Sequence, residues 1–323
     1  MVSALQTRRF LEAVVITAAL LACASGCKRS KSNGGNGTSS GNSLQTIVDS
    51  VLRAEIKGKS DTIAFNDSIV AAFASIATVG SNELKACEGL RYDYSRGCFI
   101  EDDELPDNIG FPSLTLETAF NLLQALDMGY SLSSRIPTNH GKLDWDPDSR
   151  DDHILTFESS NGTDSISFEQ GYLFSSPYVG KYLRRNTLGI EEELPELTQF
   201  EWLCLYNSLA AGNFGNCSKE ACQGVAGLLR RNVIEGTGVL YSHSKVAVAG
   251  KPAFGTAVEL ENGSVVYQTS FVGFFPYDTP IYTMMVTVLV KSDGSVLRWR
   301  SSLVQKIFNG ILDEMETIKP ISR

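Results

Sequence analysis

The sequence predicts an α/β fold in which amphipathic helices pack against an antiparallel β-sheet. Three stretches rich in β-branched and aromatic residues follow one another near the end of the chain: 246–258, 264–274 and 281–290. The connections between them, 261–263 and 276–280, have the composition of short hairpin turns. These strands are therefore expected to form a β-meander, and amphipathic segments elsewhere supply the helices.

The first third of the chain supplies one helix and two further strands. Residues 44–56 place apolar side chains at helical spacing, which predicts an amphipathic helix. Residues 69–79 form a run of small and β-branched side chains that is typical of a buried strand. A second strand is expected at 83–86, and the polar, acidic segment 87–108 is predicted to be a loop.

Three more helices are marked by apolar periodicity and by capping residues. Residues 111–130 have apolar side chains at helical spacing and a glycine near the end. Residues 197–212 begin with a capping box formed by Thr198 and Glu201. Residues 302–318 are amphipathic and are expected to pack back on the sheet.

Composition and charge limit the classes of partner. The chain has 323 residues, of which 43% are hydrophobic and 20% are charged, as in a globular protein. The net charge is −9 and the pI is about 5.0. Because phosphate binding needs clustered cations, we do not expect nucleic acid as a partner.

The N-terminus has the features of an export signal. Arg8 and Arg9 precede an apolar run from Phe10 to Leu21, which is shorter than the roughly 20 residues of a membrane span. Small residues then precede Cys23 and Cys27, as in a bacterial lipobox. The small pair before Cys27 favours that cysteine as the lipidation site, with Cys23 as the alternative.

The sequence is thereby divided into three parts. Residues 1–27 are predicted to be a lipoprotein signal peptide, 28–43 a flexible polar tether, and 44–323 a single domain. This organisation predicts an exported protein that is lipid-anchored to a bacterial membrane, on its periplasmic or cell-surface side. Cleavage without lipidation is the alternative.

The remaining five cysteines suggest two disulfides. Cys87 with Cys98 and Cys217 with Cys222 are candidate pairs in an oxidising compartment. Cys204, inside an apolar helix, is expected to be a buried free thiol.

No metal or cofactor site is predicted. Asp144, Asp146 and Asp148 have the alternating spacing of a calcium loop, but Ser149 stands where such a loop needs glycine. No cysteine and histidine spacing fits zinc. The acidic segment is therefore expected to be a solvated loop.

The strand at residues 249–257 reads AGKPAFGTA, and the next strand contains SFVGF at 270–274. This pattern resembles the active-site strand of penicillin-binding-protein transpeptidase domains, which carries K-T-G followed by T-A. Lys251 matches the motif lysine, and Gly255 and Thr256 match the end of the strand pattern. Three residues, P-A-F, interrupt the catalytic triplet.

The helix at 111–130 resembles the family's nucleophile helix, which opens P-G-S-x-x-K. Leu114 stands at the nucleophile position and Glu117 at the lysine position. Shifting the frame by one uses Ser113 but puts Leu116 where the lysine belongs. Neither register supplies a serine with a lysine one helical turn later, which is the arrangement that activates the hydroxyl.

The segment 165–189 resembles the family's second motif, in which a helix ends in S-S-N. Ser175 is retained, and Pro177 replaces the asparagine that contacts substrate in the family. Proline has neither a side-chain donor nor a backbone N–H.

The resemblance covers about residues 43–318 and implies a transpeptidase-like or β-lactamase-like fold. It implies a five-stranded antiparallel sheet with helices on both faces and a groove along the edge strand. Ser175, Lys251, Gly255 and Thr256 would give this groove its polarity.

Disruption of all three motifs implies a chain that has kept the fold and lost acyl transfer. Such a protein would bind peptidoglycan peptide, or the proteins of cell-wall synthesis and division, and would hold to a membrane through its N-terminal lipid. Two alternatives stay open. The first is a diverged but active D,D-transpeptidase or carboxypeptidase, and the second is a surface lipoprotein that uses the fold only as a platform for a partner.

Overall fold

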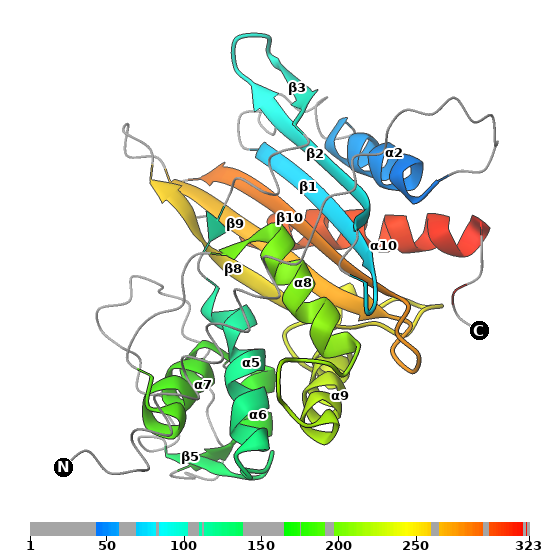
Figure 1. The fold of residues 1–323 in the computed structure, drawn as a ribbon. Coiled ribbons are helices and arrows are strands. Elements are labelled where there is room, and N and C mark those ends of the chain that lie inside the picture. Colours follow the sequence, from blue (N-terminus) through cyan, green and yellow to red (C-terminus); the bar gives the residue numbers. More distant parts are fainter. Residues whose placement is uncertain are drawn as a thin grey trace.

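The computed structural model describes residues 43–57, 69–81, 84–102, 110–111, 113–137, 165–174, 176–190, 197–259, 265–292, 297–318 and 321. Its central element is an antiparallel sheet in the order β3-β2-β1-β10-β9-β8 (Figure 1). The strands are β1 (Ile69–Thr78), β2 (Leu84–Asp93), β3 (Cys98–Glu101), β8 (Ala249–Glu259), β9 (Val265–Phe275) and β10 (Tyr282–Ser292). The expected antiparallel sheet is confirmed, with six strands among the described residues rather than five.

The additional strand, β3, lies in a segment whose polar composition predicted a loop. Strand β2 continues to Asp93 and pairs with all four residues of β3. Tyr92 packs edge-on against Phe99 across the two strands, with ring centroids 5.2 Å apart. The Asp93 carboxylate closes the turn by accepting the backbone N–H groups of Ser95 and Arg96, at 2.9 and 3.2 Å. The loop prediction is therefore wrong for this hairpin.

Two helices, α2 (Leu44–Lys57) and α10 (Leu297–Ile318), cover one face of the sheet (Figure 1). Their amphipathic character is confirmed, because the apolar face of each is buried with the facing side chains of the sheet. Phe308 of α10 meets Phe271 of β9 edge-on at 4.8 Å between ring centroids. Tyr241, from the short helix η2 (Val239–Tyr241), stacks on Phe271 at 4.1 Å.

The other face carries a layer of helices (Figure 1). These are α5 (Leu114–Asp127), α6 (Phe168–Phe174), α7 (Ser176–Tyr182), the π-helix η1 (Leu183–Leu188), α8 (Gln199–Ala210) and α9 (Lys219–Glu235). Two small antiparallel ladders join this layer: β4 (Gly110–Phe111) with β7 (Leu197–Thr198), and β5 (Arg135–Pro137) with β6 (Ser165–Ser167). Helix α8 packs on β1, β9 and β10, and both α5 and α9 contact the edge strand β8.

The start of α8 confirms the capping box read from the sequence. The hydroxyl of Thr198 accepts the backbone N–H of Glu201 at 3.2 Å, and the Glu201 carboxylate accepts the backbone N–H of Thr198 at 2.7 Å. The two contacts satisfy N–H groups that the first turn of a helix leaves without partners.

The expected disulfides are not formed. Four cysteines in the described part of the chain carry thiols: Cys87, Cys98, Cys217 and Cys222. Cys98 opposes Asp93 across the hairpin, so the strand register does not bring it to Cys87. Burial raises the pKa of the Cys217 thiol to about 12, which disfavours the thiolate that disulfide formation requires. Cys204 is buried as expected, but it is disulfide-bonded rather than free.

Several expectations fall on residues outside the described part of the chain. They include the signal peptide at 1–27, all but the last residue of the tether at 28–43, the motif residue Ser175 and the acidic segment around Asp146. Within the described residues, no helix combines the length and apolar character that crossing a membrane requires.

Candidate functional site

The motif lysine, Lys251, is a residue of the edge strand β8, and its side chain is fully buried. It opposes Val272 of β9, so its side chain points toward the layer of α5, α6 and α9. Its ammonium donates to the carbonyl oxygen of Tyr172 at 2.8 Å and to Oδ1 of Asn232 at 3.0 Å. A third bond reaches Oγ1 of Thr237 at 3.3 Å, and the Tyr172 ring lies 4.4 Å from Nζ.

The neighbouring hydrogen bonds fix the direction of each contact to Lys251. The amide nitrogen of Asn232 donates to the carbonyl of Gly250 at 2.9 Å, so the amide oxygen faces the ammonium. The Thr237 hydroxyl donates to this same oxygen at 3.0 Å, which leaves its lone pairs to accept from Lys251. A lysine ammonium has three N–H donors, and all three are therefore used within the protein.

Burial lowers the pKa of Lys251 from 10.5 to about 7, because the ammonium has lost its hydration. The oxygens that accept its hydrogen bonds belong to neutral groups, and the Tyr172 ring adds a cation–π contact. Lys251 is consequently part of the core and has no donor left for a ligand in a groove along β8.

The oxygens of Tyr172, Asn232 and Thr237 form a cage around the Lys251 ammonium. The segment Gly236-Thr237-Gly238 brings the Thr237 hydroxyl into this cage. A Cβ atom at Gly238 would lie 2.4 Å from Nδ2 of Asn232, and one at Gly236 would lie 2.7 Å from its Oδ1. Only glycine permits the chain to wrap so closely around the asparagine. The sequence analysis did not identify Asn232, which is a polar residue on the buried side of α9.

The rest of the interrupted motif follows Lys251 along the edge of the sheet. Pro252 has no backbone N–H to donate, and an edge strand is where a sheet tolerates proline. Ala253 is buried, whereas Phe254 is 42% exposed and so does not fill the interior. Gly255 is half-buried opposite Gln268, and Thr256 continues the strand opposite Tyr267, with its side chain outside the described residues.

The nucleophile position is occupied by the first residue of α5. Leu114 begins the helix, and its side chain lies against Gly180 of α7. The hydroxyl of Ser113 accepts the backbone N–H of Leu116 at 3.3 Å and so caps the helix. The hydroxyl available in the shifted register therefore has a structural role.

The lysine position holds a buried carboxylate with a cationic partner. Both oxygens of Glu117 lie 3.5 Å from Nη1 of Arg184, which η1 brings against α5. Asn121 donates from its side chain to Glu117 at 3.0 Å and lies 3.4 Å from the carbonyl of Gly180. Both charged side chains are almost fully buried, so each requires the other. Sequence reasoning did not identify Arg184 as this partner.

Helix α7 is held tightly against α5. A Cβ atom at Gly180 would lie 2.3 Å from Oγ1 of Thr118, so glycine permits the close approach. Pro177 lies in the first turn of α7, where its missing N–H costs no helical hydrogen bond. The asparagine position thus lies in the first turn of a helix, while Ser175, two residues earlier, lies outside the described residues.

The motif positions fall into two sets of contacts. Leu114 and Glu117 of α5 pack against α7 and η1, whereas Lys251 bonds to α6, α9 and the turn after α9. Contacts between α5 and β8 join the two sets. Glu117 pairs with Arg184, and the donors of Lys251 are used by neutral oxygens, so the arrangement offers no lysine to activate a hydroxyl at the start of α5.

Solved structures of penicillin-binding-protein transpeptidase domains share this fold. One is the transpeptidase domain of Burkholderia pseudomallei penicillin-binding protein 3, which is 14% identical with a TM-score of 0.59 and covers 87% of this chain and 96% of that one. The transpeptidase domain of Legionella pneumophila FtsI4 is 16% identical with a TM-score of 0.51, and the match covers 84% of this chain and 95% of that one.

Streptococcus pneumoniae penicillin-binding protein 2B is 12% identical with a TM-score of 0.60, and the match covers 84% of this chain but 58% of that protein. No protein-family model and no curated protein matches the chain. At these identities the likeness establishes the fold, and the chemistry must be argued from the side chains.

We predict that Lys251 makes stability depend on pH. Its pKa is about 7 in the folded protein and 10.5 as the ordinary value, so between these pH values the unfolded state holds a proton that the folded state lacks. The unfolding free energy should therefore rise with pH in this window, by up to about 1.4 kcal/mol per pH unit.

Urea unfolding of the parent and Lys251→Met between pH 7 and 9.5 checks this prediction. The difference between the two proteins isolates Lys251, because all other titrating groups are shared. Lys219→Met, on the exposed start of α9, is the control and should follow the parent. Parallel curves for the parent and Lys251→Met would contradict the prediction.

A second prediction concerns Glu117. Replacing it by the lysine of the transpeptidase motif places two cations together in the interior, and we expect a loss of about 3–5 kcal/mol in unfolding free energy. The charge-reversed pair Glu117→Lys with Arg184→Glu restores the attraction and should recover much of that loss.

Urea denaturation of the single and double variants measures both effects. Glu220→Lys, in the exposed first turn of α9, is the control and should change stability by no more than about 0.5 kcal/mol. The ion pair is unimportant if the double variant is as unstable as the sum of the two single variants.

Proposed function

We propose that this chain is a catalytically inactive protein with a penicillin-binding-protein transpeptidase fold, and that it acts by binding or scaffolding in peptidoglycan and cell-wall biology. The observation that carries the proposal is the state of Lys251, whose three donors bond to Tyr172, Asn232 and Thr237. A lysine held in this way has no donor free to orient a substrate carboxylate in the groove.

The start of α5 supports the same conclusion. Serine acyl transfer needs a hydroxyl, a base that removes its proton, and donors that stabilise the oxyanion. Leu114 has no hydroxyl, and Ser113 uses its hydroxyl as a helix cap. Glu117 is engaged by Arg184 inside the protein. The nucleophile and its lysine are thus both missing from this helix.

The binding role rests on the outer edge of β8. This strand is the last one of the described sheet, and β4 contacts it. We propose that an extended peptide binds along the edge of β8 that faces away from β9. Gly255 and Thr256 lie on this strand, and Ser175 follows α6 in the sequence. We assign Lys251 to the core and propose the other three as the polar positions of the groove.

The proposed ligands are a peptidoglycan peptide or proteins of cell-wall synthesis and division. No nucleic acid, metal or cofactor enters the proposal. The location proposed is the periplasmic or cell-surface side of a bacterial membrane, reached through an N-terminal lipid.

We predict that a fluorescent penicillin will not label the purified protein covalently. The reason is chemical, because an acyl-enzyme requires an activated serine at the groove. The measurement is a denaturing gel read for fluorescence, with an active transpeptidase labelled alongside. A band that survives denaturation would overturn inactivity and favour the diverged enzyme.

The binding role is tested separately by co-sedimentation with purified peptidoglycan. Retention without penicillin labelling supports binding at the cell wall. Failure to sediment, together with specific capture of a cell-division protein, favours the alternative in which the fold is a platform for a partner.

Lipidation makes a further prediction. In cells fed a labelled fatty acid, Cys27→Ser should abolish incorporation, because the thiol is the site of acylation, whereas Cys23→Ser should retain it. The opposite pattern would assign the anchor to Cys23. An unlabelled parent protein would indicate cleavage without lipidation.

A further inference from the structure

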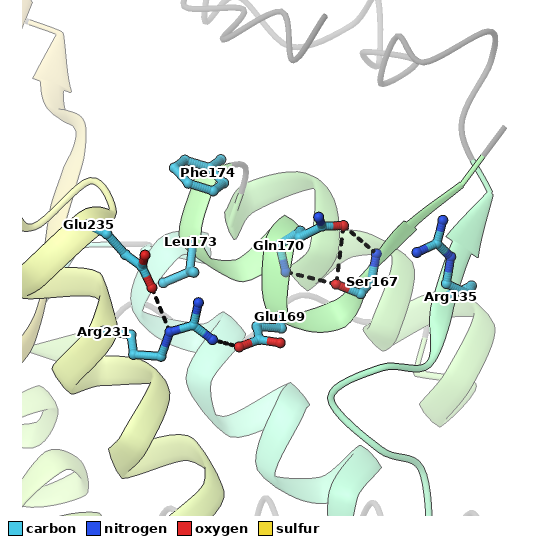
Figure 2. A pocket seen from close by; sticks show the side chains of 8 residues that line it. All are labelled: Arg135, Ser167, Glu169, Gln170, Leu173, Phe174, Arg231 and Glu235. Atoms are coloured by element: carbon cyan, nitrogen blue, oxygen red, sulfur yellow. Dashed lines mark hydrogen bonds and ion pairs between the residues drawn. The ribbon is translucent and has the colours of Figure 1, made fainter. Parts of the chain in front are cut away.

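A pocket of about 380 Å³ lies away from the motif positions, between the β5–β6 ladder, α6 and the end of α9 (Figure 2). This volume is within the range of small-ligand sites. Eight residues line it: Arg135, Ser167, Glu169, Gln170, Leu173, Phe174, Arg231 and Glu235. None of the positions matched to the transpeptidase motifs is among them, so the pocket is distinct from those positions.

One end of the pocket is cationic. Arg135 of β5 donates from Nε to the hydroxyl of Ser165 at 3.0 Å and from Nη2 to its carbonyl at 2.7 Å. These bonds orient the guanidinium and leave Nη1 available. Among the described residues, no carboxylate pairs with Arg135. The end formed by Arg135 therefore has a net charge of +1.

The opposite end has an excess of negative charge (Figure 2). Arg231 of α9 pairs with two carboxylates, Glu169 of α6 through Nη1 and Glu235 through Nε at 2.5 Å. Two carboxylates around one guanidinium leave a net charge of −1. The side chains of Glu169 and Glu235 remain 31% and 46% exposed, so both can contact a ligand.

The region between the two ends combines apolar and polar contacts. Leu173 is buried and Phe174 is 37% exposed, which gives an apolar surface. The side-chain oxygen of Gln170 accepts from the backbone N–H of Ser167 at 3.4 Å and from its hydroxyl at 3.3 Å. The Gln170 amide nitrogen is thereby left as a donor on the wall of the pocket.

We propose that this pocket binds a short zwitterionic ligand, namely an amino acid or a short peptide with free termini. Its carboxylate would bind Arg135, its ammonium would lie between Glu169 and Glu235, and an apolar side chain would rest on Phe174. A simple anion is repelled by the carboxylate end, and a simple cation is repelled by Arg135. The inference does not depend on the loss of catalysis or on the groove along β8.

Isothermal titration of the full protein with the dipeptide alanyl-leucine tests the proposal. N-acetyl-alanyl-leucine lacks the ammonium, and alanyl-leucinamide lacks the carboxylate. Each blocked peptide should bind about tenfold more weakly, which corresponds to the loss of one charge-assisted contact. Added salt should weaken binding of the free dipeptide.

Two variants assign the ends of the ligand. Arg135→Gln should bind the dipeptide and its amide equally, and Glu235→Gln should bind the dipeptide and its acetylated form equally. Arg96→Gln, on the β2–β3 turn, and Glu220→Gln, on the same helix as Glu235 but at its other end, should keep the parent's preferences. Melting curves verify that each variant is folded.

The proposal is overturned if the free dipeptide shows no heat of binding at millimolar concentration, or if all three peptides bind alike to the parent. It is also overturned if neither Arg135→Gln nor Glu235→Gln alters the preference. These outcomes are independent of penicillin labelling and of sedimentation with peptidoglycan.

Discussion

The buried ammonium of Lys251 is the interaction on which the arrangement around the edge strand depends. An isolated cation in the interior costs several kcal/mol in lost hydration. Here oxygens from α6, α9 and the turn after α9 offset part of that cost, and the same contacts tie β8 to the helical layer. The glycines at 236 and 238 give the turn the close approach that the cage requires. The motif lysine therefore works as a structural link between the sheet and the helices.

The cost of burying a charge without a partner also explains the contacts at the start of α5. A carboxylate at 117 in the interior needs a cation, and η1 supplies Arg184. Close packing of α7 against α5, through Gly180 and Thr118, brings the segment with Arg184 into reach. Glu117 and Arg184 thus form a buried ion pair. Neither residue can replace the serine nucleophile or the lysine that activates it. The residues at the motif positions are accommodated by contacts with the neighbouring helices.

On the outside of the helical layer, the charged side chains around the pocket between β5 and α9 are partly exposed to solvent. The ends of the pocket between β5 and α9 have opposite net charges, and its wall includes the exposed ring of Phe174. Tyr172 and Leu173 connect this pocket to the lysine cage, because their carbonyls accept Lys251 and the backbone N–H of Thr237, respectively. A ligand at the pocket would therefore rest on the structure that holds β8 in place.

The sequence by itself determined the antiparallel meander, the amphipathic helices, the capping box at Thr198 and the interrupted motifs, because periodicity, turn composition and caps are local properties. It also predicted a transpeptidase-like fold, which solved structures share. Only the tertiary structure decided that Lys251 points into the core and that Glu117 meets Arg184. These contacts join residues 79 and 67 positions apart, and no local pattern encodes the partner of a buried charge. The strand β3 was hidden for a related reason, since its pairing depends on cross-strand contacts that its polar composition does not reveal.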